Sequence, residues 1–179
     1  MSRAEKSCAG AVQRFLLVSL RILIGWHFLY EGYVKLTAKS WSALGYLQQA
    51  QGPLAGFFHS MAASKQALHV VNLLNAWGLT AVGLGLILGL FTRLSCVGAI
   101  LMLGMYYLAS PPWIAVLPRL TEGNYLLVDK NLVELVACAV LLFSGTGRTA
   151  GLDVFYYEWK RRRAAKAASA TGATPTEVT

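Results

Sequence analysis

One apolar stretch of the chain, residues 15–36, contains three ionisable side chains, Arg21, His27 and Glu31. A charged side chain at membrane depth costs roughly 2.5 kcal/mol or more, so such residues face protein or water and by default indicate a function. His27 and Glu31 are four residues apart, as are Glu31 and Lys35, so these side chains share one face of a helix. Arg21 lies slightly off this face and deeper in the bilayer. The stretch therefore points a base, an acid and a cation into the interior of a bundle.

The other apolar runs carry polar side chains at a similar depth. With a rise of ~1.5 Å per residue, His27, Asn75 and Glu134 come roughly 9 to 14 Å below the outer surface. A slightly shallower group consists of Glu31, Asn72, Tyr106, Asp129 and Asn131. Because all four runs contribute, the sequence predicts an outward-opening polar pocket. Arg21 is expected to form its floor and to pair with Glu31, Glu134 or both.

These residues suggest proton-transfer chemistry or a structural polar cluster. The candidate catalytic residues are Arg21, His27, Glu31 and Glu134. The candidate ligand-binding residues are Lys35, Asn72, Asn75, Tyr106, Asp129 and Asn131. A histidine near carboxylates can transfer protons, and an arginine can stabilise developing negative charge. In the structural alternative, which the sequence leaves open, an Arg21–Glu134 ion pair locks two helices and Asp129 begins a helix at the water interface.

The composition is that of a membrane protein with one domain. Of 179 residues, 56% are hydrophobic and only 13% are charged, and the length fits a single domain. The formal net charge is +8, and half of this excess lies in the last twenty residues, which include Lys160, Lys166 and the run at 161–163. Topology and anionic lipid headgroups explain a basic run after a membrane helix. We therefore expect the lipid bilayer as a partner and no binding to nucleic acid.

The three cysteines, Cys8, Cys96 and Cys138, are far apart in the sequence. They form no CxxC motif and have no spacing typical of metal ligands, so we expect no metal site. Cys96 and Cys138 fall inside apolar runs, which favours buried and unreactive thiols.

We expect an all-α fold, a polytopic membrane four-helix bundle with short interfacial helices in the first outer loop. The spans predicted from hydropathy are residues 15–36, 70–91, 94–109 and 126–144. The segment at 37–69 is too polar for a span and predicts two short interfacial pieces broken at Gly52 and Pro53. A re-entrant segment that lines a cavity is the alternative. Gly85 and Gly89 form a GxxxG pattern, which predicts close helix packing within the chain.

Charge divides the chain and orients it. Residues 1–14 form a polar cytoplasmic N-terminal segment, residues 15–153 the transmembrane domain, and residues 154–179 a basic, partly disordered cytoplasmic tail. Four spans place both termini on one side, and the excess of Arg and Lys assigns that side to the cytoplasm. The first apolar run is too long for a signal peptide and lacks a small-residue cleavage site, so we expect it to remain as the first span.

Four stretches carry a further pattern: LRILIGWHFLYEGYVKL, QGPLAGFFH, EGNYLLVDKNLVE and GTGRTAGLD. The first contains an Arg-x6-Phe-x3-Gly-x2-Lys pattern, formed by Arg21, Phe28, Gly32 and Lys35. The last contains a Gly-Arg-Gly-Asp pattern, formed by Gly147, Arg148, Gly151 and Asp153. In these stretches the chain resembles the DoxX family of small four-helix membrane proteins, in its DoxD-like branch. The resemblance covers nearly all of the chain to about Asp153.

The resemblance implies a four-helix subunit of the bacterial inner membrane in a quinone-dependent redox system. The expected cofactor is then a quinone that is not covalently bound, and the expected partner is a redox subunit or a second copy of the chain. His27 with Glu31 or Glu134 would relay protons outward, and Arg21 would stabilise an oxyanion. If the chain is an enzyme, it is a quinone-linked oxidoreductase subunit that needs its partner. The alternatives are a non-catalytic membrane scaffold or assembly factor, and a binder of a small molecule or lipid.

Overall fold

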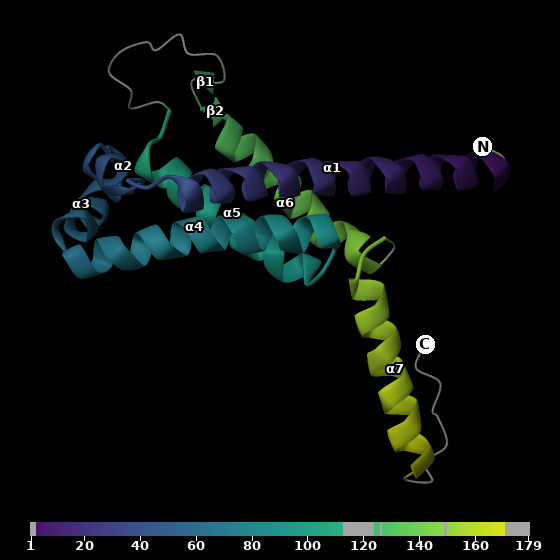
Figure 1. Ribbon diagram of the computed structural model, residues 1–179. Helices are drawn as coiled ribbons and strands as arrows, with labels where there is room; N and C mark the ends of the chain where they lie inside the picture. Colours follow the sequence, from purple (N-terminus) through teal and green to yellow (C-terminus); the bar gives the residue numbers. More distant parts are fainter. Residues whose placement is uncertain (1–2, 113–123, 126, 149, 171–179) are drawn as a thin grey trace.

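The computed structural model describes residues 3–112, 124–125, 127–148 and 150–170 (Figure 1). The body of the molecule consists of α1 (Arg3–Thr37), α4 (Lys65–Leu88), α5 (Thr92–Ala109) and α6 (Lys130–Ser144). The short helices α2 (Leu44–Gln48) and α3 (Ala55–Ala63) connect α1 to α4. A 3-10 turn, η1 (Thr146–Arg148), leads to the last helix, α7 (Asp153–Ala170). Strands β1 (Asn124–Tyr125) and β2 (Val128–Asp129) form a small antiparallel hairpin. The described fold is all-α, as predicted.

Among the described residues, three helices are long and apolar enough to cross a membrane: Ala9–Thr37 within α1, and the whole of α4 and α5. The predicted fourth span, residues 126–144, is shorter than expected. Its helix, α6, has 15 residues, or ~22 Å, against a hydrocarbon core of ~30 Å. Asp129 determines the start of α6, because its carboxylate accepts a hydrogen bond of 2.8 Å from the Leu132 amide. The residues just before α6 pair as a hairpin instead of extending the helix.

Close contact between helices holds the bundle together. α1 packs mainly against α4, and α5 packs mainly against α6. A Cβ atom added at Gly83 of α4 would collide with the backbone of Leu29, and one added at Gly32 of α1 would lie 2.7 Å from the Thr80 amide nitrogen. Small residues therefore set the distance between α1 and α4. The buried core contains Ile24, Phe28, Leu79, Val82, Leu86, Cys96, Ala99, Leu103, Cys138 and Leu141. Cys96 and Cys138 are free thiols and fully buried, as predicted.

Glycines in the left-handed conformation end two of the helices. Gly89 (φ 63°) follows α4 and Gly145 (φ 65°) follows α6, which is a conformation that glycine adopts without strain. The predicted GxxxG pair packs within the chain, because Gly85 faces Ser95 and Gly89 faces Gly151.

The helices α2 and α3 fold over one end of the bundle, which we call the α2–α3 end. A small apolar core there contains Ala43, Leu47, Ala50, Phe58 and Ala109. Gly52 has no room for a side chain, because a Cβ atom would collide with the Leu108 carbonyl oxygen. Two short helices separated at Gly52 and Pro53 are what the sequence predicted for this loop.

At the opposite end, which we call the α7 end, Asp153 joins distant segments. Its carboxylate accepts hydrogen bonds from the Phe91 amide (2.7 Å) and the Thr92 amide (3.0 Å) at the start of α5. α7 then leaves the bundle at a steep angle to α1 and α4 (Figure 1). The basic part of the predicted tail is therefore helical as far as Ala170, and the prediction of disorder at 171–179 lies outside the described residues.

Candidate functional site

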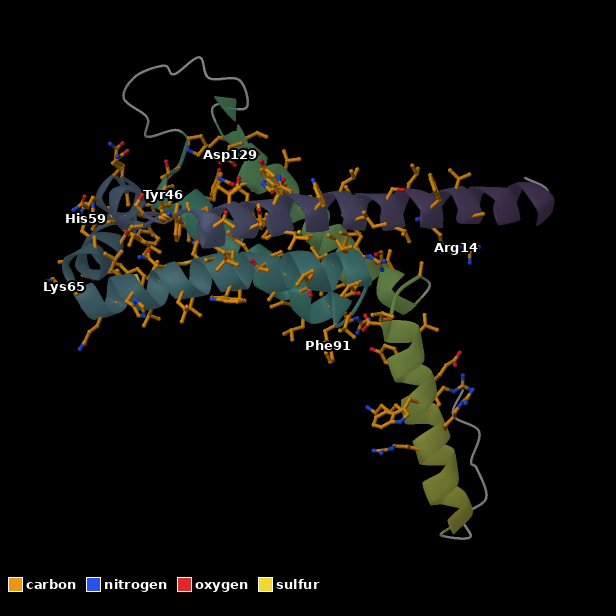
Figure 2. All side chains as sticks on the ribbon, viewed as in Figure 1. Arg14, Tyr46, His59, Lys65, Phe91 and Asp129 are labelled. Carbon is orange, nitrogen blue, oxygen red and sulfur yellow. The ribbon has the colours of Figure 1, made fainter. Side chains whose placement is uncertain are left out.

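A cavity of about 290 Å³ lies at the α2–α3 end of the bundle. Sites for small molecules measure roughly 300–1,000 Å³, so this cavity has room for a small ligand or a single head group. Its walls come from α1, α4, α5 and α6 and from the segment that leads into α2. Figure 2 shows Tyr46 and Asp129 at this end of the molecule, and Phe91 towards the other.

Seven of the ten predicted site residues line the cavity: His27, Glu31, Lys35, Asn75, Tyr106, Asn131 and Glu134. They come from four helices, which is the convergence that their depth in the sequence predicted. The fold thus brings these residues together, and their chemical roles stay predictions.

An ion pair joins α1 to α6 in the cavity wall. Nδ1 of His27 lies 2.9 Å from Oε1 of Glu134, and the two side chains are 39% and 21% exposed. The pair is therefore accessible both to solvent and to a ligand in the cavity. A histidine held by a carboxylate is oriented to donate or accept a proton through its other ring nitrogen.

A second ion pair lies one turn further along α1. Nζ of Lys35 is 2.6 Å from Oε2 of Glu31 and 5.5 Å from the centre of the Trp41 ring. Lys130 of α6 adds another cation to the lining. The cavity therefore combines two carboxylates with two lysines, so it can hold a polar ligand that carries oxygen acceptors.

Two buried polar atoms of the lining make no close hydrogen bond among the described residues, although the side chains that carry them lie next to each other. These atoms are Oδ1 of Asn75 and the hydroxyl oxygen of Tyr106. A buried polar group without a hydrogen bond costs about 1–3 kcal/mol, so each needs a water molecule or a ligand. Phe28, Leu79 and Leu103 supply apolar wall between the polar groups. The cavity is thus an apolar site with a few convergent polar atoms, which is typical of ligand pockets.

One wall of the cavity is the segment at residues 41–46, which runs into the first turn of α2 and which we call the cover segment. Trp41, Ser42, Ala43 and Tyr46 of this segment line the cavity. Tyr46 donates a hydrogen bond of 2.9 Å to the carbonyl oxygen of Tyr106. Burial, followed by the negative charge of Asp129, raises the pKa of Tyr46 to about 12. Tyr46 therefore stays neutral and keeps this hydrogen bond at ordinary pH.

Two predicted site residues, Asn72 and Asp129, support the cavity from outside its lining. The side chain of Asn72 accepts a hydrogen bond of 2.8 Å from the Ala43 amide and donates one of 3.3 Å to Ser42, which holds the cover segment. Asp129 caps α6 and accepts a hydrogen bond of 2.9 Å from Asn131. Asp129 therefore begins a helix, as the structural alternative predicted, and orients a lining residue.

Arg21 does not form the floor of the cavity. It lies at the α7 end, where it is 2% exposed and Nη2 donates a hydrogen bond of 2.5 Å to the Ala150 carbonyl oxygen. Asp153 is the nearby opposite charge, and the ion pairs of the described residues join Arg21 to neither predicted glutamate. The spacing explains the difference: six residues rotate Arg21 by roughly 120° from His27 and displace it by ~9 Å along the helix.

Four polar or aromatic residues of the lining were not predicted from the sequence: Trp41, Ser42, Tyr46 and Lys130. Lys130 lies between Asp129 and Asn131, both of which were predicted, so its position along the chain was a usable signal. Trp41 and Ser42 come from the loop before α2, and Tyr46 comes from α2 itself, a helix of 5 residues. Both are too short to show helical periodicity in the sequence, and only the tertiary fold brings these residues to the cavity.

Among the described residues, no group of three or more histidine, cysteine, aspartate or glutamate side chains is arranged to hold a metal ion.

Comparison with known proteins gives one match, to the family model described as DoxX, over residues 16–111. Comparison with curated proteins and with solved structures gives no match. The matched residues include His27, Glu31, Asn75 and Tyr106 of the cavity, whereas Glu134 lies beyond them. Because the match covers more than half of the chain and three helices can span a bilayer, this chain is a helical membrane protein that belongs to the DoxX family.

Proposed function

We propose that the cavity binds the head group of a quinone and that the chain is a subunit of a membrane redox system. The observation that carries this proposal is the presence of the His27–Glu134 pair in one apolar-walled cavity with two unpartnered polar atoms. A quinone head group is a flat apolar ring with oxygen atoms on opposite sides. The lining has apolar surface for the ring and polar atoms for the oxygens.

The unpartnered atoms match both oxidation states of such a ligand. The Tyr106 hydroxyl can donate a hydrogen bond to a quinone carbonyl oxygen, and Oδ1 of Asn75 can accept one from a quinol hydroxyl group. Binding then removes the cost of leaving these atoms unpaired. The site can therefore hold the ligand before and after reduction.

The ionisable residues supply the protons of the reaction. Reduction of a quinone to a quinol takes up two electrons and two protons, and the electrons come from a separate redox subunit. His27 delivers a proton through its free ring nitrogen while Glu134 stabilises the charged imidazole. The next proton comes from water at the partly exposed rim of the cavity, and Glu31 relays it by first accepting it in place of its contact with Lys35 and then releasing it. Arg21 has no part in these steps, because it lies at the α7 end.

We further propose that the protein lies in the inner membrane of a bacterium with both termini in the cytoplasm. The excess of basic residues at the N-terminus, in the first turn of α5 (Arg93) and after α6 supports this orientation. The cavity would then face the outer side, where its protons would come from.

Binding of a soluble quinone analogue to the purified protein in detergent tests the function. The matched variants are Tyr106→Phe, which removes only the unpartnered hydroxyl, and Tyr30→Phe, which removes an exposed hydroxyl of α1 outside the cavity. We expect saturable binding that Tyr106→Phe weakens roughly two- to tenfold, as the loss of one hydrogen bond does. Tyr30→Phe should bind like the wild type. Absence of saturable binding to well-folded protein would exclude the quinone site.

The second candidate is a non-catalytic scaffold, which the projecting helix α7 favours (Figure 1). The double variant His27→Gln, Glu134→Gln separates the two functions. If the chain is a redox subunit, the variant loses quinone turnover while its fold and its binding to the partner persist. If the chain is a scaffold, the variant either loses its binding to the partner or shows no change at all.

A further inference from the structure

We propose that α7 lies in the headgroup layer of the membrane and binds anionic phospholipids through its basic run, residues 160–163. This inference is independent of the quinone site, which lies at the other end of the bundle. It depends on the direction of α7, on its level relative to α1 and on its side chains.

The direction of α7 follows that of the membrane surface. α1 and α4 run alongside each other, and α7 leaves them at a steep angle (Figure 1). Because α1 and α4 cross the bilayer and α7 lies at a steep angle to them, α7 runs roughly parallel to the membrane surface. The start of α7 is firmly attached, because the Leu152 amide donates to the Leu88 carbonyl oxygen (3.1 Å) and the Asp153 amide donates to the Gly89 carbonyl oxygen (2.9 Å).

α7 begins at a depth that the membrane still covers. Gly89, to which Asp153 is bound, also contacts Arg21 of α1. From Arg21 towards the N-terminus, the next six residues of α1 are apolar except for Ser19 and cover ~9 Å. Leu16 (59%) and Phe15 (70%) are exposed there. Figure 2 shows Arg14 further along this direction than Phe91. Because these apolar side chains need lipid around them, the membrane extends past the level at which α7 begins.

The side chains of α7 match this environment. Lys160, Arg161, Arg162 and Arg163 are all exposed, and guanidinium groups bind phosphate with paired hydrogen bonds. Trp159 is also exposed, and the Arg163 guanidinium lies 3.9 Å from the centre of its ring. Tryptophan is enriched at membrane interfaces, and clustered basic residues next to a membrane span bind anionic lipids. The charge and the position of α7 therefore both favour a lipid surface.

Hydrogen exchange of the full-length protein in nanodiscs tests this proposal. One lipid mixture contains phosphatidylcholine alone and the other also contains phosphatidylglycerol. We expect slower exchange in α7 when phosphatidylglycerol is present, and loss of this difference in the triple variant Arg161→Gln, Arg162→Gln, Arg163→Gln. Three cations near a surface account for roughly a hundredfold in surface affinity, and high salt should abolish the effect.

The matched control is the double variant Lys39→Gln, Lys65→Gln, which removes exposed cations at the α2–α3 end. It should keep the full effect of phosphatidylglycerol. Equal exchange of wild-type α7 in the two lipid mixtures would overturn the proposal, as would an undiminished effect in the triple variant. Protection of α7 that requires an added acidic protein, and not phosphatidylglycerol, would overturn it as well.

Discussion

At the scale of single residues, the cavity contains both paired and unpaired polar groups. Asn75 and Tyr106 each keep one buried polar atom without a partner among the described residues, whereas His27 and Glu134 satisfy each other. Buried polar atoms cost about 1–3 kcal/mol each unless water or a ligand pairs them. A ligand that pairs them therefore stabilises the fold as well as occupying the site.

Tyr46 makes this part of the protein sensitive to alkaline pH. Its pKa rises from 10.0 to about 12 in the folded state, so the folded protein holds this proton more tightly than the unfolded chain does. The resulting stability is fully present below about pH 10 and is lost as the pH rises towards about 12. We expect the melting temperature to fall across this window in the wild type.

Thermal unfolding at several pH values checks this expectation with two variants. Tyr46→Phe should melt lower at neutral pH, because it lacks the hydrogen bond to the Tyr106 carbonyl oxygen, but its melting temperature should change less between about pH 10 and 12. Tyr33→Phe, at an exposed position of α1, should follow the wild type. An identical alkaline slope in Tyr46→Phe and the wild type would show that Tyr46 is not the titrating group.

At the scale of elements, the helices depend on each other for their position. α1 approaches α4 closely because Gly25, Gly32 and Gly83 expose backbone at the contact. This contact places His27 and Glu31 beside Asn75, and the pairing of α5 with α6 places Tyr106 near Glu134. The site therefore depends on two helix pairs, and a change in either distance alters the cavity.

A glycine substitution measures how strictly the α1–α4 distance is set. Gly83→Ala adds a Cβ atom that collides with the Leu29 backbone, so we expect a loss of about 1–3 kcal/mol and a lower melting temperature in detergent. Gly104→Ala of α5 is the matched control, because the nearest atom to its Cβ position is 4.0 Å away. Equal melting temperatures for the two variants would contradict the close α1–α4 contact.

At the scale of the whole molecule, much of the architecture was predictable from the sequence. Hydropathy located α1, α4 and α5, and the break at Gly52 located α2 and α3. Seven of the ten residues predicted from their depth along the apolar runs line one cavity. Depth could be predicted because the rise of a helix per residue is constant. The position of Arg21 was wrong, since depth alone does not give the direction in which a side chain points. The cover segment was also missed, because a short loop and a helix of 5 residues show no periodic pattern of hydrophobic residues in the sequence.

Asp153 connects α4, α5 and α7 by hydrogen bonds, and its replacement should therefore lower the stability of the whole fold. Its carboxylate caps α5 while its amide binds the end of α4. We expect Asp153→Ala to cost about 0.5–2 kcal/mol, as the loss of a helix cap does. Glu158→Ala, an exposed acidic residue of the same helix, should stay within about 0.5 kcal/mol of the wild type.

Chemical denaturation in detergent, followed by circular dichroism, measures both changes. Hydrogen exchange should also become faster at the start of α5 in Asp153→Ala, because the amides of Phe91 and Thr92 lose their acceptor. Unchanged exchange at these amides would argue against the cap.

The length of α6 has a consequence for the bilayer itself. A helix of 15 residues spans ~22 Å, which leaves a mismatch of roughly 8 Å with the hydrocarbon core. Lipids beside a short helix thin or deform to cover it, so headgroups and water come closer to the face that carries Glu134. Under the proposed function, we expect this mismatch to bring water to the edge of the cavity without a channel through the bundle. Proton access would then depend on membrane thickness, and a thicker bilayer would slow it.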